Sequence, residues 1–159
     1  MKSDDQAASM ALSALFLDIF RANGRLIAAG DQLIAPLGLT SARWQVLGAV
    51  AMATTPQPVA HLARDMGLAR QGVQRIVNEL ADEDFVAFED NPHHRRAKLV
   101  RLTPRGQQVM SAAHKLQRPW VDILAAGLDA SKIAIAAEVL ETLRNRLEDG
   151  TNPEGADQD

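Results

Sequence analysis

The chain has 159 residues, a length that suits one domain with an extension and that suffices to bury a hydrophobic core. It contains no cysteine, which excludes disulfide bonds, thiolate metal sites and cysteine-based redox sensing. The net charge of −3 does not by itself indicate a nucleic-acid binder, but the basic residues are unevenly distributed. Residues 91–106 include no acid and five bases, namely Arg95, Arg96, Lys98, Arg101 and Arg105.

The first part of the chain carries apolar residues at three- and four-residue steps, which predicts an amphipathic helix over residues 8–35, ended by Pro36 and Gly38. Asp4 and Asp5 argue against the basic leader of a signal peptide, and Asp18 interrupts the apolar run. No run approaches the ~18 apolar residues that a membrane span requires. We therefore expect a cytoplasmic protein without a membrane segment.

Three further helices and a loop are expected before residue 85. Thr40 is predicted to cap a second helix, whose inner face carries Trp44, Leu47 and Val50. Residues 54–58, rich in Thr and Pro, are predicted to form a loop. A short helix over residues 59–66 ends at Gly67, and a longer one over residues 69–83 turns inward Val73, Ile76, Val77 and Leu80.

Beyond residue 85 the apolar period changes from helical to alternating. Val86 and Phe88 alternate with polar neighbours on one side of residues 91–94, and Val100 and Leu102 do so on the other. This pattern predicts a two-stranded β-hairpin with a polar, basic tip. Thr103 and Pro104 then begin a helix, which is predicted to kink at Pro119 and to end at Gly127.

The end of the chain is expected to hold one more helix and a tail. The helix carries a long apolar stripe of Ile133, Ala137, Leu140, Leu143 and Leu147. Residues 150–159 are polar and acidic, which favours disorder. The fold class predicted is therefore mainly α with a small β-hairpin wing: a winged helix-turn-helix plus a helical region that invites a second copy of the chain.

The segment from Leu62 to Ile76 has the pattern of a helix-turn-helix. Two short helices that cross at a steep angle need a small residue at the crossing, here Ala63, and a glycine at the turn, here Gly67. Leu62, Met66, Leu68, Val73 and Ile76 are expected to fill the apolar positions of the contact.

The second helix of such a unit enters the major groove of DNA through its N-terminal turns. The residues predicted to lie outward there are Arg70, Gln71, Gln74 and Arg75, types that bond guanine, adenine or phosphate. The hairpin tip adds three bases that suit phosphates or the minor groove: Arg95, Arg96 and Lys98. The alternative for both sets is a solvated, charged surface, and the helix-turn-helix pattern favours contact with double-stranded DNA.

Residues 40–110 resemble the MarR family of bacterial and archaeal regulators. The resemblance rests on Leu39-Thr40, on Leu62-Ala63-Arg64 through Gly67-Leu68, on Arg70–Val73 and above all on Arg95–Gly106. It implies a homodimer with an N-terminal dimerisation helix (1–38), a DNA-binding domain (39–105), C-terminal dimerisation helices (106–149) and a tail (150–159). It also implies a pseudo-palindromic operator, most often repression, and in many members release of DNA by a small aromatic or anionic effector. Arg96 matches the family's arginine at the wing tip.

Three positions depart from the family pattern. His94 stands where an aspartate usually precedes the two arginines of the wing, which puts the wing geometry and its pH response in question. Ala69 offers no side-chain cap to the helix that it precedes. Asp84 replaces a usual glycine and is expected to tolerate left-handed backbone.

Other functions are weaker readings of the residues. No nucleophile elbow, phosphate loop or metal motif occurs, so no catalytic residue, cofactor site or metal site is predicted. His93 and His94 are adjacent and lack a spaced carboxylate partner, which favours a solvent-facing role over metal binding. Trp44 is expected in the core rather than beside a ligand pocket. A protein-interaction module and an architectural DNA binder without operator preference remain alternatives, and the salt dependence and specificity of binding distinguish them.

Overall fold

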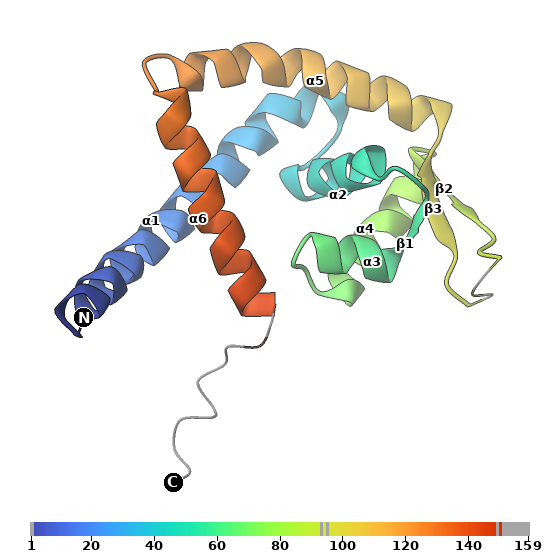
Figure 1. Cartoon of the computed structure of the whole chain (residues 1–159). Helices are drawn as coiled ribbons and strands as arrows, with labels where there is room; N and C mark the ends of the chain where they lie inside the picture. The colour runs from blue at the N-terminus through green and yellow to red at the C-terminus, as the bar shows by residue number, and fades with distance from the viewer. Residues whose placement is uncertain (1, 93, 95, 149, 151–159) are drawn as a thin grey trace, which may run out of the picture. The chain divides into compact units, whose positions relative to one another are not determined.

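The structure is a computed structural model that describes residues 2–92, 94, 96–148 and 150. Its elements, drawn in Figure 1, are α1 (Lys2–Ile34), the 3-10 helix η1 (Ala35–Leu37), α2 (Ser41–Met52), β1 (Gln57–Pro58), α3 (Val59–Asp65), α4 (Arg70–Asp82), β2 (Val86–Glu89), β3 (Leu99–Leu102), α5 (Pro104–Ala125) and α6 (Ala130–Glu148). The chain divides into two compact units, one ending at Pro119 and the other beginning at Trp120. The two units are described separately below.

The first helix is longer than its apolar period suggests. α1 begins at Lys2 rather than at residue 8, with Asp4 and Asp5 in its first turn, where negative charge favours the helix dipole. It ends at Ile34, and Gly38 then adopts the left-handed backbone (φ 70°) that closes η1. The predicted stop at Pro36 and Gly38 is confirmed.

α2 is fixed to α1 by hydrogen bonds at its first turn. Thr40 caps the helix as predicted, because its Oγ1 accepts the Arg43 N–H at 3.3 Å. The N–H of Ser41, the first residue of α2, donates to Asp31 Oδ1 of α1 at 2.6 Å. The Ser41 hydroxyl donates to the Ile27 carbonyl at 2.8 Å. Sequence periodicity alone did not indicate this junction.

The wing is a three-stranded sheet, in the order β1-β3-β2, rather than the two-stranded hairpin expected. The β2–β3 hairpin is present, with Val86 opposite Leu102 and Phe88 opposite Val100. The expectation of a loop over residues 54–58 is wrong at its end, because Gln57 pairs with Val100 and Pro58 with Leu99. Pro58 cannot donate to a ladder, so its strand is short and lies at the edge, which leaves no alternating pattern to recognise.

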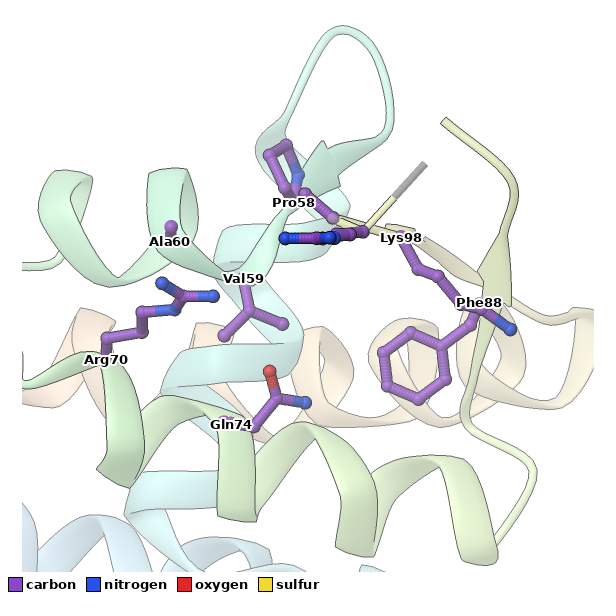
Figure 2. A pocket seen from close by; sticks show the side chains of 9 residues that line it. Pro58, Val59, Ala60, Arg70, Gln74, Phe88 and Lys98 are labelled. Atoms are coloured by element: carbon purple, nitrogen blue, oxygen red, sulfur yellow. The ribbon is translucent and has the colours of Figure 1, made fainter. Parts of the chain in front are cut away.

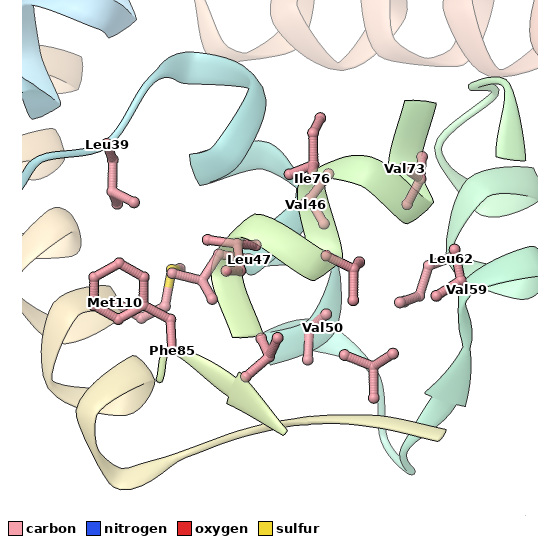
Figure 3. Packing of buried hydrophobic residues seen from close by; sticks show 14 of the residues in the cluster. Leu39, Val46, Leu47, Val50, Val59, Leu62, Val73, Ile76, Phe85 and Met110 are labelled. Carbon is pink, nitrogen blue, oxygen red and sulfur yellow. The ribbon is translucent and has the colours of Figure 1, made fainter. Parts of the chain in front are cut away.

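The core of the first unit lies where α2, α3 and α4 meet the sheet. Figure 3 shows Leu47, Ile76 and Phe85 within this cluster of buried side chains. All four inward residues predicted for α4 are buried: Val73, Ile76, Val77 and Leu80. Trp44 is half-buried and packs against the cluster. Leu68, which was expected to fill the helix-turn-helix contact, is instead 48% exposed. Phe88, an apolar residue of the hairpin, is 36% exposed.

α4 ends in the left-handed turn expected at Asp84. Asp84 has φ 60°, its N–H bonds the Ala81 carbonyl, and the Phe85 N–H bonds the Leu80 carbonyl, a pairing that closes the last helical turn. The Thr103 hydroxyl then donates to the Asp84 carbonyl at 2.5 Å and accepts the Gly106 N–H at 3.0 Å. Thr103 thus caps α5, as predicted, and ties its start to the end of α4.

The second unit consists of the end of α5 and of α6. Pro119 lies inside α5, and Gly127, with φ 78°, follows the helix as expected. Asp129 caps α6, because its Oδ1 accepts the Ser131 N–H at 2.8 Å. α6 has no buried residue. Within the described ranges, no helix combines the length and apolar character that a membrane span requires.

Candidate nucleic-acid interface

The turn between α3 and α4 has the hydrogen bonds of a helix-turn-helix. The Leu68 N–H bonds the Ala63 carbonyl and the Gly67 N–H bonds the Arg64 carbonyl, both at 2.9 Å. This pair of hydrogen bonds can end α3 only if a residue just after the helix adopts a left-handed backbone. Gly67 does so, with φ 63°. Ala63 is 1% exposed, which agrees with its predicted place at the helix crossing. Leu68, by contrast, lies outside the contact.

The outward side of α4 carries the four residues predicted for it. Arg70, Gln71 and Arg75 are exposed and Gln74 is half-buried, whereas Val73 and Ile76 lie inside. Ala69 precedes the helix without a side-chain cap, as its sequence implied, so the first N–H groups of α4 have no such partner there. The amide and guanidinium groups therefore stand beside a helix N-terminus that attracts anions.

A fifth residue, Asn78, belongs to this surface and was missed by the sequence reasoning. It lines a groove along α4 together with Arg70, Gln71, Gln74 and Arg75. Its Oδ1 accepts the Gln74 amide at 3.0 Å and orients it. Asn78 stands four residues after Gln74, and this helical spacing is the signal that would have found it.

Arg75 has a local partner, since its Nη1 lies 3.2 Å from Glu79 Oε1. The Arg75 side chain is 75% exposed and the pair is separated by one helical turn. An exposed pair of this kind contributes at most ~1 kcal/mol, so Arg75 can exchange it for another anion at small cost.

The tip of the wing is closed by Asn91, a second residue that the sequence reasoning missed. Its side-chain amide donates to the Ala97 carbonyl at 3.0 Å, and its Oδ1 accepts the His94 N–H at 3.2 Å. Asn is typical of tight turns, and this preference is the signal that would have found it. The turn is therefore held from Asn91, and His94, the residue at the departure from the family pattern, is exposed and contributes its backbone.

The five bases of residues 91–106 divide by their contacts. Arg96 and Lys98 are exposed beside α4. Arg101 pairs across the hairpin with Glu89, and the Arg105 guanidinium lies 5.1 Å from the centroid of the Phe85 ring. Arg95 lies outside the described residues, as does His93. The cations free to face a ligand in the described wing are therefore Arg96 and Lys98.

A groove of about 310 Å³ separates the wing from α4. It brings together four of the predicted residues, namely Arg70, Gln74, Arg96 and Lys98. Figure 2 shows Arg70 and Gln74 on one side of the groove, and Lys98 and the Phe88 ring together on the other. Among its described lining residues the groove has three cations and no acid, so it favours an anionic partner. Gln71 and Arg75 do not line it and lie along α4.

A second cleft lies between α2 and α5, away from these cations. It has a volume of about 470 Å³ and is lined by Trp44, Gln45, Gly48, Ala49, Ala51, Met52, Met110, His114 and Gln117. Trp44 therefore both packs on the core and borders a cleft. No cluster of His, Asp and Glu suited to a metal ion is found in the part of the chain that the structure describes.

Known proteins resemble the chain in sequence. The MarR family profile matches residues 37–97. An uncharacterized protein of Mycobacterium tuberculosis is 38% identical over 101 residues, which make up 64% of this chain and 69% of the relative. The transcriptional activatory protein BadR of Rhodopseudomonas palustris is 27% identical over 151 residues, 91% of this chain and 86% of that protein.

Solved structures share the fold. A mutant of MarR from E. coli complexed with operator DNA gives a TM-score of 0.73 at 22% identity, covering 84% of this chain and 95% of that one. CouR from Rhodococcus jostii RHA1, bound to p-coumaroyl-CoA, gives a TM-score of 0.74 at 20% identity, covering 82% of this chain and 91% of that one. The expected fold class, a mainly helical chain with a winged helix-turn-helix, is confirmed.

Proposed function

Because this chain belongs to the MarR family of winged helix-turn-helix DNA-binding transcription regulators, which are not enzymes, we propose that it acts as a homodimer on a pseudo-palindromic operator. The observation that carries the proposal is the surface formed by α4 and the wing. Arg70, Gln71, Gln74 and Arg75 stand outward on one helix, and Arg96 and Lys98 stand beside them across a cationic groove.

Each part of this surface is assigned a task by its chemistry. The amides and guanidinium groups of α4 are suited to base edges in the major groove, where Gln pairs with adenine and Arg with guanine. Arg96 and Lys98 are suited to phosphates and to the narrow minor groove next to it. Arg95, the neighbour of Arg96 in the sequence, is proposed for the same task.

A homodimer is supported by apolar side chains that the chain itself leaves exposed. On α1, Phe20 is 72% exposed and Leu17 56%, and on α6, Ile135 is 59% exposed. Exposed apolar residues on this scale mark surfaces that bind a partner. A two-fold dimer whose recognition helices stand about 34 Å apart, or a multiple of that distance, meets successive major grooves.

Repression is the outcome we propose for operator binding, following the commonest behaviour implied by the family resemblance. Activation is a second candidate, because BadR is named a transcriptional activatory protein and aligns with 91% of this chain. A reporter gene placed behind the selected operator separates the two: deletion of the regulator raises expression if it represses and lowers expression if it activates.

A small-molecule effector is proposed for the cleft beside Trp44. Its lining is mainly apolar, with Trp44 and Met110 offering flat and flexible surface and His114 and Gln117 offering polar groups. CouR, which shares the fold, has been solved with p-coumaroyl-CoA bound. We expect an effector to release the wild-type protein from DNA. The Trp44→Ala variant should stay bound to DNA when the same effector is added.

The test of the DNA-binding proposal is in vitro selection of bound sequences by the wild-type protein. We expect an inverted repeat, one dimer per repeat, and affinity that falls steeply with salt because bound cations are released from DNA. Arg96→Ala should weaken binding to all sequences, whereas Gln74→Ala should change the selected sequence more than the overall affinity. Arg21→Ala, which removes an exposed arginine of α1, is the matched control and should change neither.

If Gln74→Ala and Arg75→Ala both leave the selected sequence unchanged, α4 is not the recognition helix. A protein that binds no duplex under any salt condition contradicts the function itself and favours a protein-interaction module.

A further inference from the structure

Phe88 is exposed where an apolar strand residue is expected inside. Phe88 and Val86 are two residues apart on β2 and so lie on the same face of the strand. Phe88 is nevertheless 36% exposed, whereas Val86 is 2% exposed. Its cross-strand neighbour Val100 is 1% exposed. The Phe88 ring points into the groove between the wing and α4 (Figure 2). An aromatic ring at this place covers part of the core edge and offers the rest of its surface to whatever enters the groove.

The groove combines an apolar floor with cationic rims. Pro58, Val59 and Phe88 form its apolar part. Arg70 stands on α4, and Arg96 and Lys98 stand on the wing. A ligand that fits this surface therefore has an apolar centre with an anionic group on either side. One anionic group lies near α4 and the other near the wing.

The backbone of DNA has that chemistry. When a recognition helix lies in the major groove and a wing reaches the adjacent minor groove, one sugar-phosphate strand passes between them. Along this strand, charged phosphates alternate with deoxyribose rings, whose carbon atoms are apolar. The charge and the apolar floor of the groove are complementary to one sugar and its flanking phosphates.

We propose that the ring of Phe88 packs against a deoxyribose of the strand that passes between wing and recognition helix, while Arg70, Arg96 and Lys98 hold the phosphates on either side. The inference rests on the proposed DNA-binding function. It makes Phe88 an affinity residue that contacts DNA without contacting a base edge.

Two properties distinguish such a contact from those of its neighbours. An apolar contact neutralises no phosphate, so it releases no counterion and leaves the salt dependence of binding unchanged. A sugar is common to every nucleotide, so the contact strengthens operator and non-operator DNA alike.

The experiment measures the affinity of the full-length dimer for its selected operator and for a scrambled duplex of equal length, across a series of salt concentrations. Phe88→Ala should weaken binding to both duplexes by about tenfold, with the salt slope unchanged. Phe88→Leu, which keeps an apolar side chain at the same place, should retain most of the affinity. Lys98→Ala should make the salt slope shallower by about 0.9, the value for one lost phosphate contact.

A purely structural role for Phe88, as a cover for Val100, is tested in parallel by thermal unfolding and by a gain-of-charge variant. Phe88→Lys places a cation where we put the sugar and its phosphates, so it should steepen the salt slope by about 0.9. This result does not depend on how Phe88→Ala folds, because it requires only that the Lys variant be folded and bind.

The inference is overturned by wild-type affinity in folded Phe88→Ala, by a loss confined to the operator, or by an unchanged salt slope in Phe88→Lys. A wild-type protein that binds neither duplex contradicts the proposed function instead, which keeps the two failures distinct.

Discussion

Gly106 is required by a close approach of two backbone segments. It lies in the first turn of α5 and is buried against the end of α4, where a Cβ atom would stand 1.9 Å from the Phe85 carbonyl oxygen. That distance is far below any real contact, and the obstacle is backbone rather than a side chain that can move. The same region contains the Thr103 cap and the left-handed Asp84, so the junction of the wing and α5 is tightly packed.

Gly106→Ala should therefore lower the free energy of unfolding by about 2–3 kcal/mol, the cost of overpacking a tight interior. Urea denaturation at a fixed protein concentration measures it. The matched control is Gly72→Ala in α4, where no atom lies within 4 Å of the added Cβ. That variant should raise the free energy of unfolding by about 0.5–1 kcal/mol, because alanine favours a helix over glycine. Equal effects of the two substitutions would contradict the close approach at Gly106.

α6 begins at a capping carboxylate, Asp129, whose pKa is lowered by its hydrogen bonds. Asp129 Oδ1 accepts the Ser131 hydroxyl at 2.7 Å and the Ser131 N–H at 2.8 Å. These hydrogen bonds to the Ser131 side chain and backbone lower the pKa of Asp129 below its ordinary value of 3.8. A carboxyl with a lowered pKa in the folded state stabilises that state above its unfolded pKa, and the contribution is lost as the pH falls through the folded pKa.

The first turn of α6 should therefore stay closed at neutral pH and open as the pH falls below 3.8. Amide hydrogen exchange at Ser131 and Lys132 measures the opening. Asp129→Asn keeps a capping oxygen that does not titrate, so its protection should be independent of pH over the same range. Identical pH profiles in the two proteins would show that Asp129 does not control the turn.

The helices at the two ends of the chain leave many large apolar side chains exposed. Six large apolar residues of α1 and five of α6 are exposed, and α6 buries none of its residues. The proposed DNA-binding surface, in contrast, belongs to a unit with a closed core. We propose that the exposed stripes meet those of a second copy, which completes the burial that a single chain lacks.

The protein should sediment as a dimer at micromolar concentration, and Ile135→Glu should shift it toward monomer, because a buried charge in an apolar contact is costly. Ile135 is 59% exposed in the single chain. Leu68→Glu, at an exposed apolar residue of the helix-turn-helix, is the control and should stay dimeric. A wild-type monomer at that concentration would contradict the proposed dimer.

Local sequence patterns were enough to predict most of the helices and the hairpin. The helical and alternating periods located the α-helices and the hairpin, and the caps at Thr40 and Thr103 followed from residue type. Gly67 and Asp84 marked the left-handed turns before and after α4, because few residues accept positive φ. The apolar period of α4, with Val73 and Ile76 inward, also put the four predicted residues on the opposite side, where three are exposed and Gln74 is half-buried.

Features that depend on contacts between distant segments could not be predicted from local patterns. The pairing of Gln57 and Pro58 with β3 needs a partner some forty residues away, and a two-residue strand has no period of its own. Phe88 has the alternation of a core residue, yet the core ends beside it and the groove begins. Asn91 and Asn78 act through hydrogen bonds that exist only once the turn and the helix are formed. Which residues are buried, and which residues pair, depends on how the whole chain packs. The apolar period limits these choices but does not determine them.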